Sequence, residues 1–330
     1  MNDLLTDSAE KLFSAIATPA AVMKIEGGAD CRPLWQQIEE SGFLDALSPE
    51  DAGGAGMALH ETFPLLFAAG RHALPVPLAA TCWARSLLGE RRDVAGPITL
   101  AVNSKFDDDR SVTAHTVPFG LVAQWIAINR REHCWLLPAA AAKRWSPGVH
   151  GSLQAHLHWR EWPADAIELG PAQPLQEIGA VLWSAMLAGA MVRVLDLTVV
   201  YANERTQFGR PIGKFQAIQQ NLAEIAELVH ASAMAAEMAA RAGMPKKGDL
   251  LAAVAKARTS AAVGRVATVA HAVHGAMGIT AEYPLHLWTR RLHEWRLDFG
   301  SETLWRTRIG HSLLSNKEQS ALDFMLEALA

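Results

Sequence analysis

The sequence predicts a multi-domain α+β protein with three parts. These are an all-α N-terminal domain over residues 1–94, a small β domain over residues 95–168 and a C-terminal four-helix bundle over residues 169–330. Apolar residues recur at helical spacing in the first and last parts, and short β-rich runs separated by Asp, Pro and Gly fill the middle. The chain of 330 residues is also longer than one ordinary domain, and its hydrophobic content of 50 % is enough to form a large core.

The N-terminal domain is predicted from short amphipathic patterns. Two early stripes of apolar residues lie at near-helical spacing and end before Gly42: Leu5, Leu12, Phe13 and Ile16, then Leu34, Trp35 and Ile38. The β domain is predicted from the runs ITLAV, VTAHTVPFGLVAQWIAI, HCWLLP and LQAHLHW, which are rich in β-branched and aromatic residues.

Long helical stripes return after Pro171 and predict the bundle. The first two contain Trp183, Leu187, Met191 and Val194, and then Ile218, Leu222, Ile225 and Val229. A third helix is expected after the GMPKKGD break, where Asp249 is a suitable N-cap, and a fourth from about Glu302 to the C-terminus.

Composition and charge argue against a nucleic-acid-binding, secreted or membrane-spanning protein. A formal net charge of -4 gives no broad basic field, so nucleic-acid binding is not expected. The acidic N-terminus does not resemble a signal peptide, and we expect no membrane span. The three cysteines, Cys31, Cys82 and Cys134, follow neither zinc-ligand nor CxxC spacing, which favours a cytoplasmic protein.

Two further patterns have simple structural interpretations. The GGAG stretch at residues 53–56 follows no buried strand, so we interpret it as a turn and not as a phosphate loop. The histidine pairs at 156/158 and 271/274 lack nearby acidic or thiol ligands that would complete a metal site, so no metal is expected.

The stretch YANERTQFGRPIGKFQ, residues 201–216, is the most informative part of the sequence. Arg205 can bind a pyrophosphate with its planar fork, Phe208 can stack on an aromatic ring, and Gln207 and Gln216 can bind polar edges. These residue types suit an adenine dinucleotide. A solvated corner that carries two arginines explains the same pattern equally well.

Two segments at a characteristic distance resemble the acyl-CoA dehydrogenase family. RTQFGRPIGKFQAIQ is similar to the family's R-x-x-F-G-x-x-I-x-x-x-Q segment, and HGAMGITAEYP, from residue 274, is similar to G-G-x-G-x-x-x-E-Y-P. PEDAGGAGM also resembles an N-terminal turn of that family, and the order of the three predicted domains matches along the whole chain.

The resemblance implies an FAD cofactor shared with a neighbouring subunit. It places Arg205, Gln207 and Phe208 at the adenylate and pyrophosphate, with the following residues also near the cofactor: Ile212, Gln216, Gly275, Gly278, Ser301 and Thr303. It further implies an acyl-CoA substrate, α,β-dehydrogenation of its thioester and electron transfer to an electron-transfer flavoprotein.

The catalytic base of the family is missing from both of its usual positions. Dehydrogenation needs a carboxylate to remove the α proton. One usual position is Phe299, in DFGSE, and the other aligns with about Gly179, two residues after Glu177. Asp298 and Glu302 flank the first position and are the remaining candidates for the base.

Other differences from the family pattern indicate which oligomer the chain forms. The β domain looks shortened, it lacks the T-E-P and W-x-T/S-N segments, and Ala272 replaces a common glutamine. These features resemble the short subunits of heterotetrameric acyl-CoA dehydrogenases of steroid side-chain breakdown. We therefore expect a homodimer, a homotetramer or a heterotetramer. The alternatives are a catalytically silent subunit that completes a partner's flavin site and a flavoprotein with oxidase or oxygenase chemistry.

Overall fold

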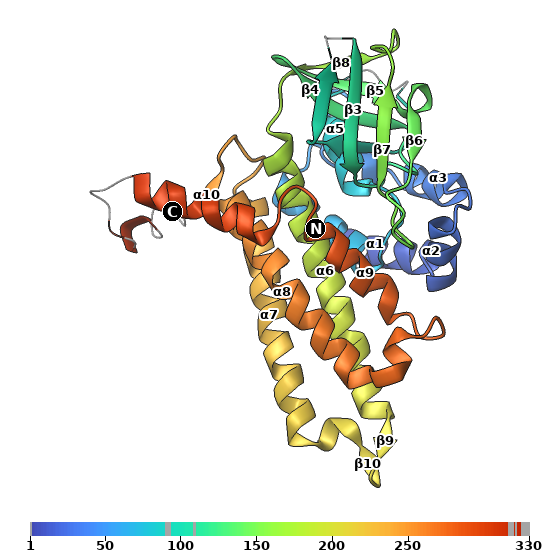
Figure 1. The fold of residues 1–330 in the computed structure, drawn as a ribbon, viewed down its shortest axis with the longest axis vertical. Coiled ribbons are helices and arrows are strands. Elements are labelled where there is room, and N and C mark those ends of the chain that lie inside the picture. Colours follow the sequence, from blue (N-terminus) through green and yellow to red (C-terminus); the bar gives the residue numbers. More distant parts are fainter. Residues whose placement is uncertain (1, 90–93, 108–109, 316–319, 321, 325–330) are drawn as a thin grey trace. The chain divides into compact units, whose positions relative to one another are not determined.

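The computed structural model describes residues 2–89, 94–107, 110–315, 320 and 322–324 (Figure 1). The chain forms two compact units, Met1–Gly179 and Ala180–Ala330. The predicted α+β fold class is confirmed, because helices precede and follow a small β region. The predicted domain boundaries at residues 94 and 168 stay predictions.

The first unit begins with short helices. They are α1 (Asn2–Ile16), α2 (Pro19–Glu26), α3 (Arg32–Glu40), the 3-10 turn η1 (Phe43–Asp45), α4 (Leu59–Arg71) and α5 (Leu78–Ser86). Gly42 follows α3 at a positive φ of 76°, a conformation that glycine adopts without steric cost. The 53–56 glycines lie in a turn whose amides bond back to residues 45–50, as expected.

Two four-stranded sheets follow the helices of this unit. One sheet has the order β1-β4-β5-β8, and the other has the order β2-β3-β7-β6. Their strands are β1 (Ile98–Ala101), β2 (Ser104–Asp107), β3 (Ser111–Val117), β4 (Trp125–Arg130), β5 (His133–Pro138), β6 (Lys143–Trp145), β7 (Ala155–Trp159) and β8 (Ile167–Pro171), with a 3-10 turn η2 at Ala139–Ala141. Both sheets contribute to one apolar core that includes Val112, Ile128 and Trp159.

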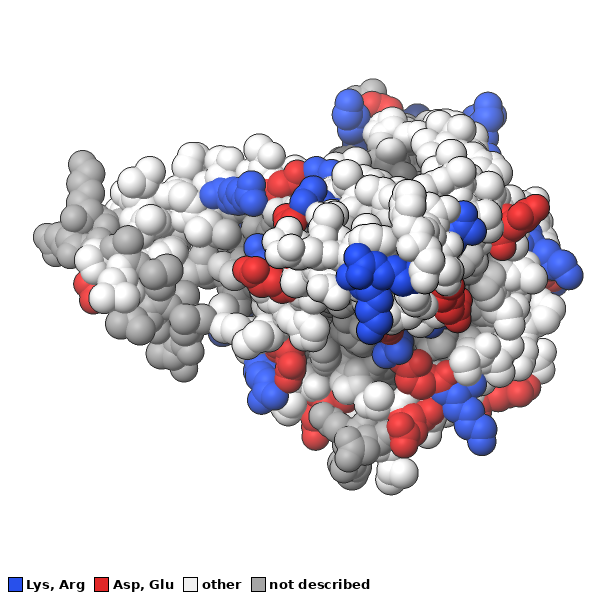
Figure 2. Space-filling model, turned by 90° about the horizontal axis from the view of Figure 1, so that it is seen from below, with Lys and Arg blue, Asp and Glu red and all other residues white. Residues whose placement is uncertain are grey.

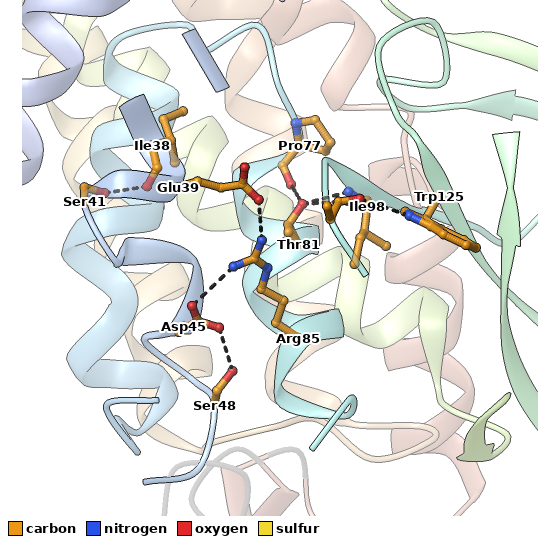
Figure 3. Close-up of polar contacts among 11 residues, drawn as sticks. Ile38, Glu39, Ser41, Asp45, Ser48, Pro77, Thr81, Arg85, Ile98 and Trp125 are labelled. Carbon is orange, nitrogen blue, oxygen red and sulfur yellow. Dashed lines mark hydrogen bonds and ion pairs between the residues drawn. The ribbon is translucent and has the colours of Figure 1, made fainter. Parts of the chain in front are cut away.

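Polar contacts join the helices of the first unit to its sheet (Figure 3). The Thr81 hydroxyl on α5 donates to the carbonyl of Ile98 on β1 and accepts from its amide. Arg85, four residues later, forms ion pairs with Glu39 at 2.6 Å and Asp45 at 3.2 Å. Both ends of α5 are therefore fixed, one to the sheet and one to the earlier helices.

The second unit contains the long helices. They are α6 (Leu175–Glu204), which begins just before the unit boundary, α7 (Gln216–Arg241), α8 (Leu250–His274), α9 (Leu285–Trp295) and α10 (Glu302–Ser315). Asp249 caps α8 as predicted, because its carboxylate accepts from the amide of Ala252. Ala180, Ala253, Ala257 and Trp305 form a core cluster that joins α6, α8 and α10 (Figure 1).

The helix count of the bundle needs a correction. The described residues of this region form five helices and not four, because α9 was not predicted. The sequence does contain an apolar pattern that indicates this helix. Its members lie at helical spacing and are all buried: Leu285, Trp288, Leu292 and Trp295. The predicted end of the last helix falls largely outside the described residues.

By length and composition alone, helix α6 could cross a membrane, although the sequence led us to expect no membrane span. In the most apolar window of this helix, 89 % of the residues are buried inside the fold. A core helix of a soluble protein meets the same test, so this helix is weak evidence for a membrane span.

Candidate functional site

The corner predicted to bind a dinucleotide forms a hairpin at the end of α6. Thr206–Gln207 (β9) pairs with Arg210–Pro211 (β10), and the amide of Ile212 donates to the carbonyl of Arg205 at 2.8 Å. Phe208 and Gly209 form the tip with φ values of 52° and 80°. Glycine adopts such values readily, whereas a bulky residue does so rarely.

The hairpin tip presents an aromatic ring to solvent. The Phe208 residue is 90 % exposed, and its ring packs edge-on against Phe215 with the centroids 6.1 Å apart. The Arg210 guanidinium lies 4.3 Å from the centroid of Phe215. Arg205 and Lys214 are also exposed. Figure 2 views the lower end of Figure 1, where Lys and Arg side chains gather.

The remaining predicted residues of this corner follow directly. Ile212 begins the 3-10 turn η3 (Ile212–Lys214), and Gln216 begins α7. Free amides at a helix N-terminus favour an anion such as a phosphate. The corner therefore combines exposed cations, an exposed ring and a helix N-terminus.

The second predicted segment is the turn η4 (Gly275–Ile279), which follows α8. Gly275 has a φ of 58° and a ψ of -139°, and a Cβ there would meet no atom within 4 Å. At Gly278, by contrast, a Cβ would lie 2.9 Å from His274 Cβ and 3.2 Å from His271 Nδ1. Gly275 is therefore open to an approaching group, and Gly278 is required for packing.

The buried His274 and the half-buried His271 support this turn. His274 donates from Nδ1 to the carbonyl of Ala270 at 2.8 Å, and its buried Nε2 has no hydrogen-bond partner among the described residues. His271 Nε2 lies 3.0 Å from Thr289 Oγ1. Burial lowers the pKa of both imidazoles below the ordinary value, and neighbouring histidines lower that of His271 further. Both rings are therefore neutral at physiological pH.

The resemblance aligns Phe299 with a usual position of the family's catalytic base. Phe299 is 3 % exposed, and its ring packs edge-on against Trp183 with the centroids 4.6 Å apart. The other usual position, Gly179, and the nearby Glu177 both lie in α6, where residues two apart point about 200° from one another. Neither Phe299 nor Gly179 carries a carboxylate, and the Glu177 side chain leaves α6 in a different direction from position 179.

Asp298, the first candidate for the base, is buried beside a fully buried lysine. Its Oδ2 accepts from Trp183 Nε1 at 3.1 Å. The Lys256 ammonium donates to Ser260 Oγ and to the carbonyls of Trp295, Arg296 and Gly300, at 2.9 to 3.1 Å. Burial lowers the pKa of Lys256 to about 7, although Asp298 and Glu302 oppose this shift.

Glu302, the second candidate, begins α10 and pairs with the guanidinium of Arg296. Burial raises the pKa of Glu302, but a backbone hydrogen bond and Arg296 outweigh that effect and hold the pKa below the ordinary value. A lowered pKa makes a carboxylate a weaker base. Ser301 accepts from the amide of Leu304 near the start of α10, and Thr303 is exposed.

Sequence reasoning missed three features of this region. They are the Lys256 ammonium, the contact between Trp183 and Phe299, and the stacking of Tyr201 on His274. One signal was available for Lys256, which lies seven residues before Val263 and so falls on the buried stripe of its helix. The other two contacts join residues 73 or more positions apart and have no local signal.

Comparisons with known proteins agree with the fold. The family model described as "Acyl-CoA dehydrogenase, C-terminal domain" matches residues 177–314. The chain is 29 % identical over 307 residues to "Acyl-CoA dehydrogenase IpdE2" of Mycobacterium tuberculosis, covering 88 % of this chain and 90 % of that protein. The crystal structure of the ChsE4-ChsE5 complex from the same organism matches with a TM-score of 0.83 at 23 % identity, over 97 % of this chain and 98 % of that one.

A second solved structure, the Tcur3481-Tcur3483 steroid ACAD, matches with a TM-score of 0.80 at 23 % identity. It covers 95 % of this chain and 98 % of that one.

Proposed function

The chain is a member of the acyl-CoA dehydrogenase family, and we propose that it is one subunit of a heteromeric acyl-CoA dehydrogenase. In this assembly the chain helps to hold FAD, and a second subunit type supplies the catalytic base. The observation that carries the proposal is Phe299: a buried phenyl ring, packed on Trp183, occupies the position where the family usually has its glutamate. A phenyl ring cannot accept a proton.

The residues of the corner fit FAD. Arg205 would bind the pyrophosphate, the exposed Phe208 ring would stack on an aromatic part of the cofactor, and Gly275 leaves room for close approach. Gln207, Ile212, Gln216 and Gly278 belong to the same two segments, and Ser301 and Thr303 belong to the segment after Phe299. When bound, FAD supplies the acceptor for the hydride that leaves the β carbon of an acyl-CoA.

The relatives support a heteromeric assembly. The ChsE4-ChsE5 and Tcur3481-Tcur3483 structures are named as pairs of different proteins, and the first covers nearly the whole of this chain. We therefore place the chain with a second acyl-CoA dehydrogenase subunit and an electron-transfer flavoprotein as electron acceptor. The acyl-CoA dehydrogenase relatives support a cytoplasmic location for the chain.

The test uses the full chain, purified alone and co-expressed with candidate subunits encoded near it. We expect bound flavin in the complex, with acyl-CoA-dependent reduction of a dye only when the partner has its own glutamate. A colourless protein under both conditions would refute the cofactor assignment.

Arg205→Ala isolates the contribution of the corner. A charge-assisted contact to phosphate is worth roughly 2 to 4 kcal/mol, so flavin binding should weaken by tens- to several-hundred-fold. Arg205→Lys keeps the charge but loses the planar fork, so it should give an intermediate affinity. If both variants bind flavin as the wild type does and the oligomer is intact, the corner is only a solvated surface.

A second assignment makes Asp298 or Glu302 the base of this chain. The observation that favours Asp298 is its burial at 6 % exposure, because a carboxylate with little water around it is a stronger base. Asp298→Asn keeps an acceptor for Trp183 and removes the proton acceptor. Lost dehydrogenation with normal flavin content would support this assignment, and unchanged activity would refute it.

A further inference from the structure

Three aromatic side chains from distant parts of the chain pack together at the end of α6. Tyr201 stacks on His274 with the ring centroids 4.4 Å apart and 27° between the planes. Tyr283 lies 5.8 Å from Tyr201 and 4.8 Å from His274, centroid to centroid. This Tyr201–His274–Tyr283 cluster joins α6, the end of α8 and the segment before α9.

Hydrogen bonds strengthen the same connections. The Tyr201 hydroxyl donates to the carbonyl of His274 at 3.2 Å, directly before the open backbone of Gly275. The Tyr283 hydroxyl donates to the carbonyl of Leu197 on α6 at 3.4 Å. Each tyrosine therefore contacts its neighbouring segment through both its ring and its hydroxyl.

At position 274 a phenylalanine would stabilise the fold more than the histidine that is present. Its Nε2 is buried without a hydrogen-bond partner among the described residues, and an unpartnered buried acceptor lowers stability. A phenylalanine would stack without that loss. Only the histidine, however, can donate from Nδ1 to the carbonyl of Ala270, which fixes the plane of the ring on which Tyr201 stacks.

The cluster lies between the two segments assigned to the cofactor. Arg205 follows Tyr201 by one helical turn, and Gly275 follows His274 directly. We infer that the Tyr201–His274–Tyr283 cluster is a positioning element, which holds the 201–216 corner and the Gly275–Ile279 turn at one spacing so that both meet the same FAD. This inference rests on the proposed function, because it needs both segments to bind one cofactor.

The first experiment compares Tyr201→Leu with Tyr201→Phe as the matched control. The leucine variant loses the stacked ring, and the phenylalanine variant loses only the hydroxyl. In titrations of the full chain with FAD, we expect the leucine variant to bind about tenfold more weakly and the phenylalanine variant to stay within about twofold of wild type. Hydrogen exchange without FAD should become faster in both segments for the leucine variant only.

His274→Phe is the second variant and covers the case in which Tyr201→Leu does not fold. It keeps a stacking ring, removes the unpartnered Nε2 and loses the bond to Ala270. We expect stability equal to or above that of wild type together with FAD binding weakened by about threefold to tenfold. A residue with a purely structural role would not separate these two properties.

Arg205→Ala distinguishes the possible failures. If Arg205→Ala weakens FAD binding but Tyr201→Leu and His274→Phe leave both FAD affinity and exchange unchanged, the positioning role is wrong and the cofactor assignment stands. If none of the three changes FAD affinity, or the wild type does not bind FAD, the assignment itself fails and the inference fails with it.

Discussion

Replacing Lys256 by methionine tests the electrostatic organisation beside Phe299. Lys256 is fully buried, and its ammonium donates to one hydroxyl and three carbonyls within 3.1 Å. Methionine has a similar length and no charge, so it leaves these acceptors without a donor and Asp298 without its neighbouring cation. Buried acceptors that lose their donor cost about 1 to 3 kcal/mol each, and we expect a loss of about 3 kcal/mol in the free energy of unfolding.

Urea denaturation followed by tryptophan fluorescence measures this loss, with Asp298→Asn and the double variant completing a cycle. Asparagine can still accept from Trp183 Nε1, so it removes the charge with little change of shape. We expect the double variant to recover about 1 to 3 kcal/mol, because it no longer buries an isolated carboxylate. A loss below about 1 kcal/mol for Lys256→Met would show that the buried charge does not organise this turn.

Three further predictions concern the stability contributions of Lys256, Phe299 and Gly278. Between about pH 7 and 10.5 the unfolded wild type binds a proton at Lys256 that the folded wild type lacks, because folding lowers the pKa of Lys256. The free energy of unfolding of the wild type should therefore rise with pH over this range relative to that of Lys256→Met. Urea titrations at several pH values measure this difference. Phe299→Glu should lower the free energy of unfolding by roughly 3 to 5 kcal/mol, because it removes the contact with Trp183 and buries a second carboxylate beside Asp298; thermal denaturation measures it. Gly278→Ala should cost about 1 to 3 kcal/mol because its Cβ would approach His274 too closely, whereas Gly310→Ala, in open space on α10, should be neutral or slightly stabilising in the same assay.

The regular parts of the fold could be predicted because their signals are local. Apolar stripes predicted α6, α7 and α8, and Asp249 marked the start of α8, where its side chain does accept a backbone amide. Helix α9, which was not predicted, is short and follows a glycine-rich segment. The order of strands within the two sheets was not predictable, because register depends on pairing between residues far apart in the chain.

The candidate site was predictable only where its residues are consecutive. The corner from Arg205 to Gln216 was found as one stretch, and its backbone does form a hairpin followed by a helix N-terminus. The surroundings of Asp298 were not foreseen, since Lys256 and Trp183 come from helices 42 and 115 residues earlier in the chain. The role of a carboxylate depends on such neighbours, and they cannot be identified from a sequence in which they lie far apart.

Phe208 and Phe299 share a backbone conformation but differ in the surroundings of their side chains. Both have a positive φ, 52° and 56°, which a phenylalanine adopts at a cost of about 1 to 3 kcal/mol. The cost at Phe299 is offset within the chain, because the side chain is buried against Trp183 and its carbonyl accepts from Trp305 Nε1 at 3.1 Å.

Phe208 has no comparable compensation. It is 90 % exposed, and its ring packs edge-on against Phe215. A strained, exposed aromatic residue contributes little to the fold of its own chain, so its contribution has to come from something that covers it. The positive φ of Phe299 is therefore accompanied by burial within the chain, whereas the positive φ of Phe208 belongs to a two-residue hairpin loop that leaves its ring exposed, as the proposed cofactor contact requires. The two positions together favour a subunit that holds a cofactor over one that performs the proton transfer.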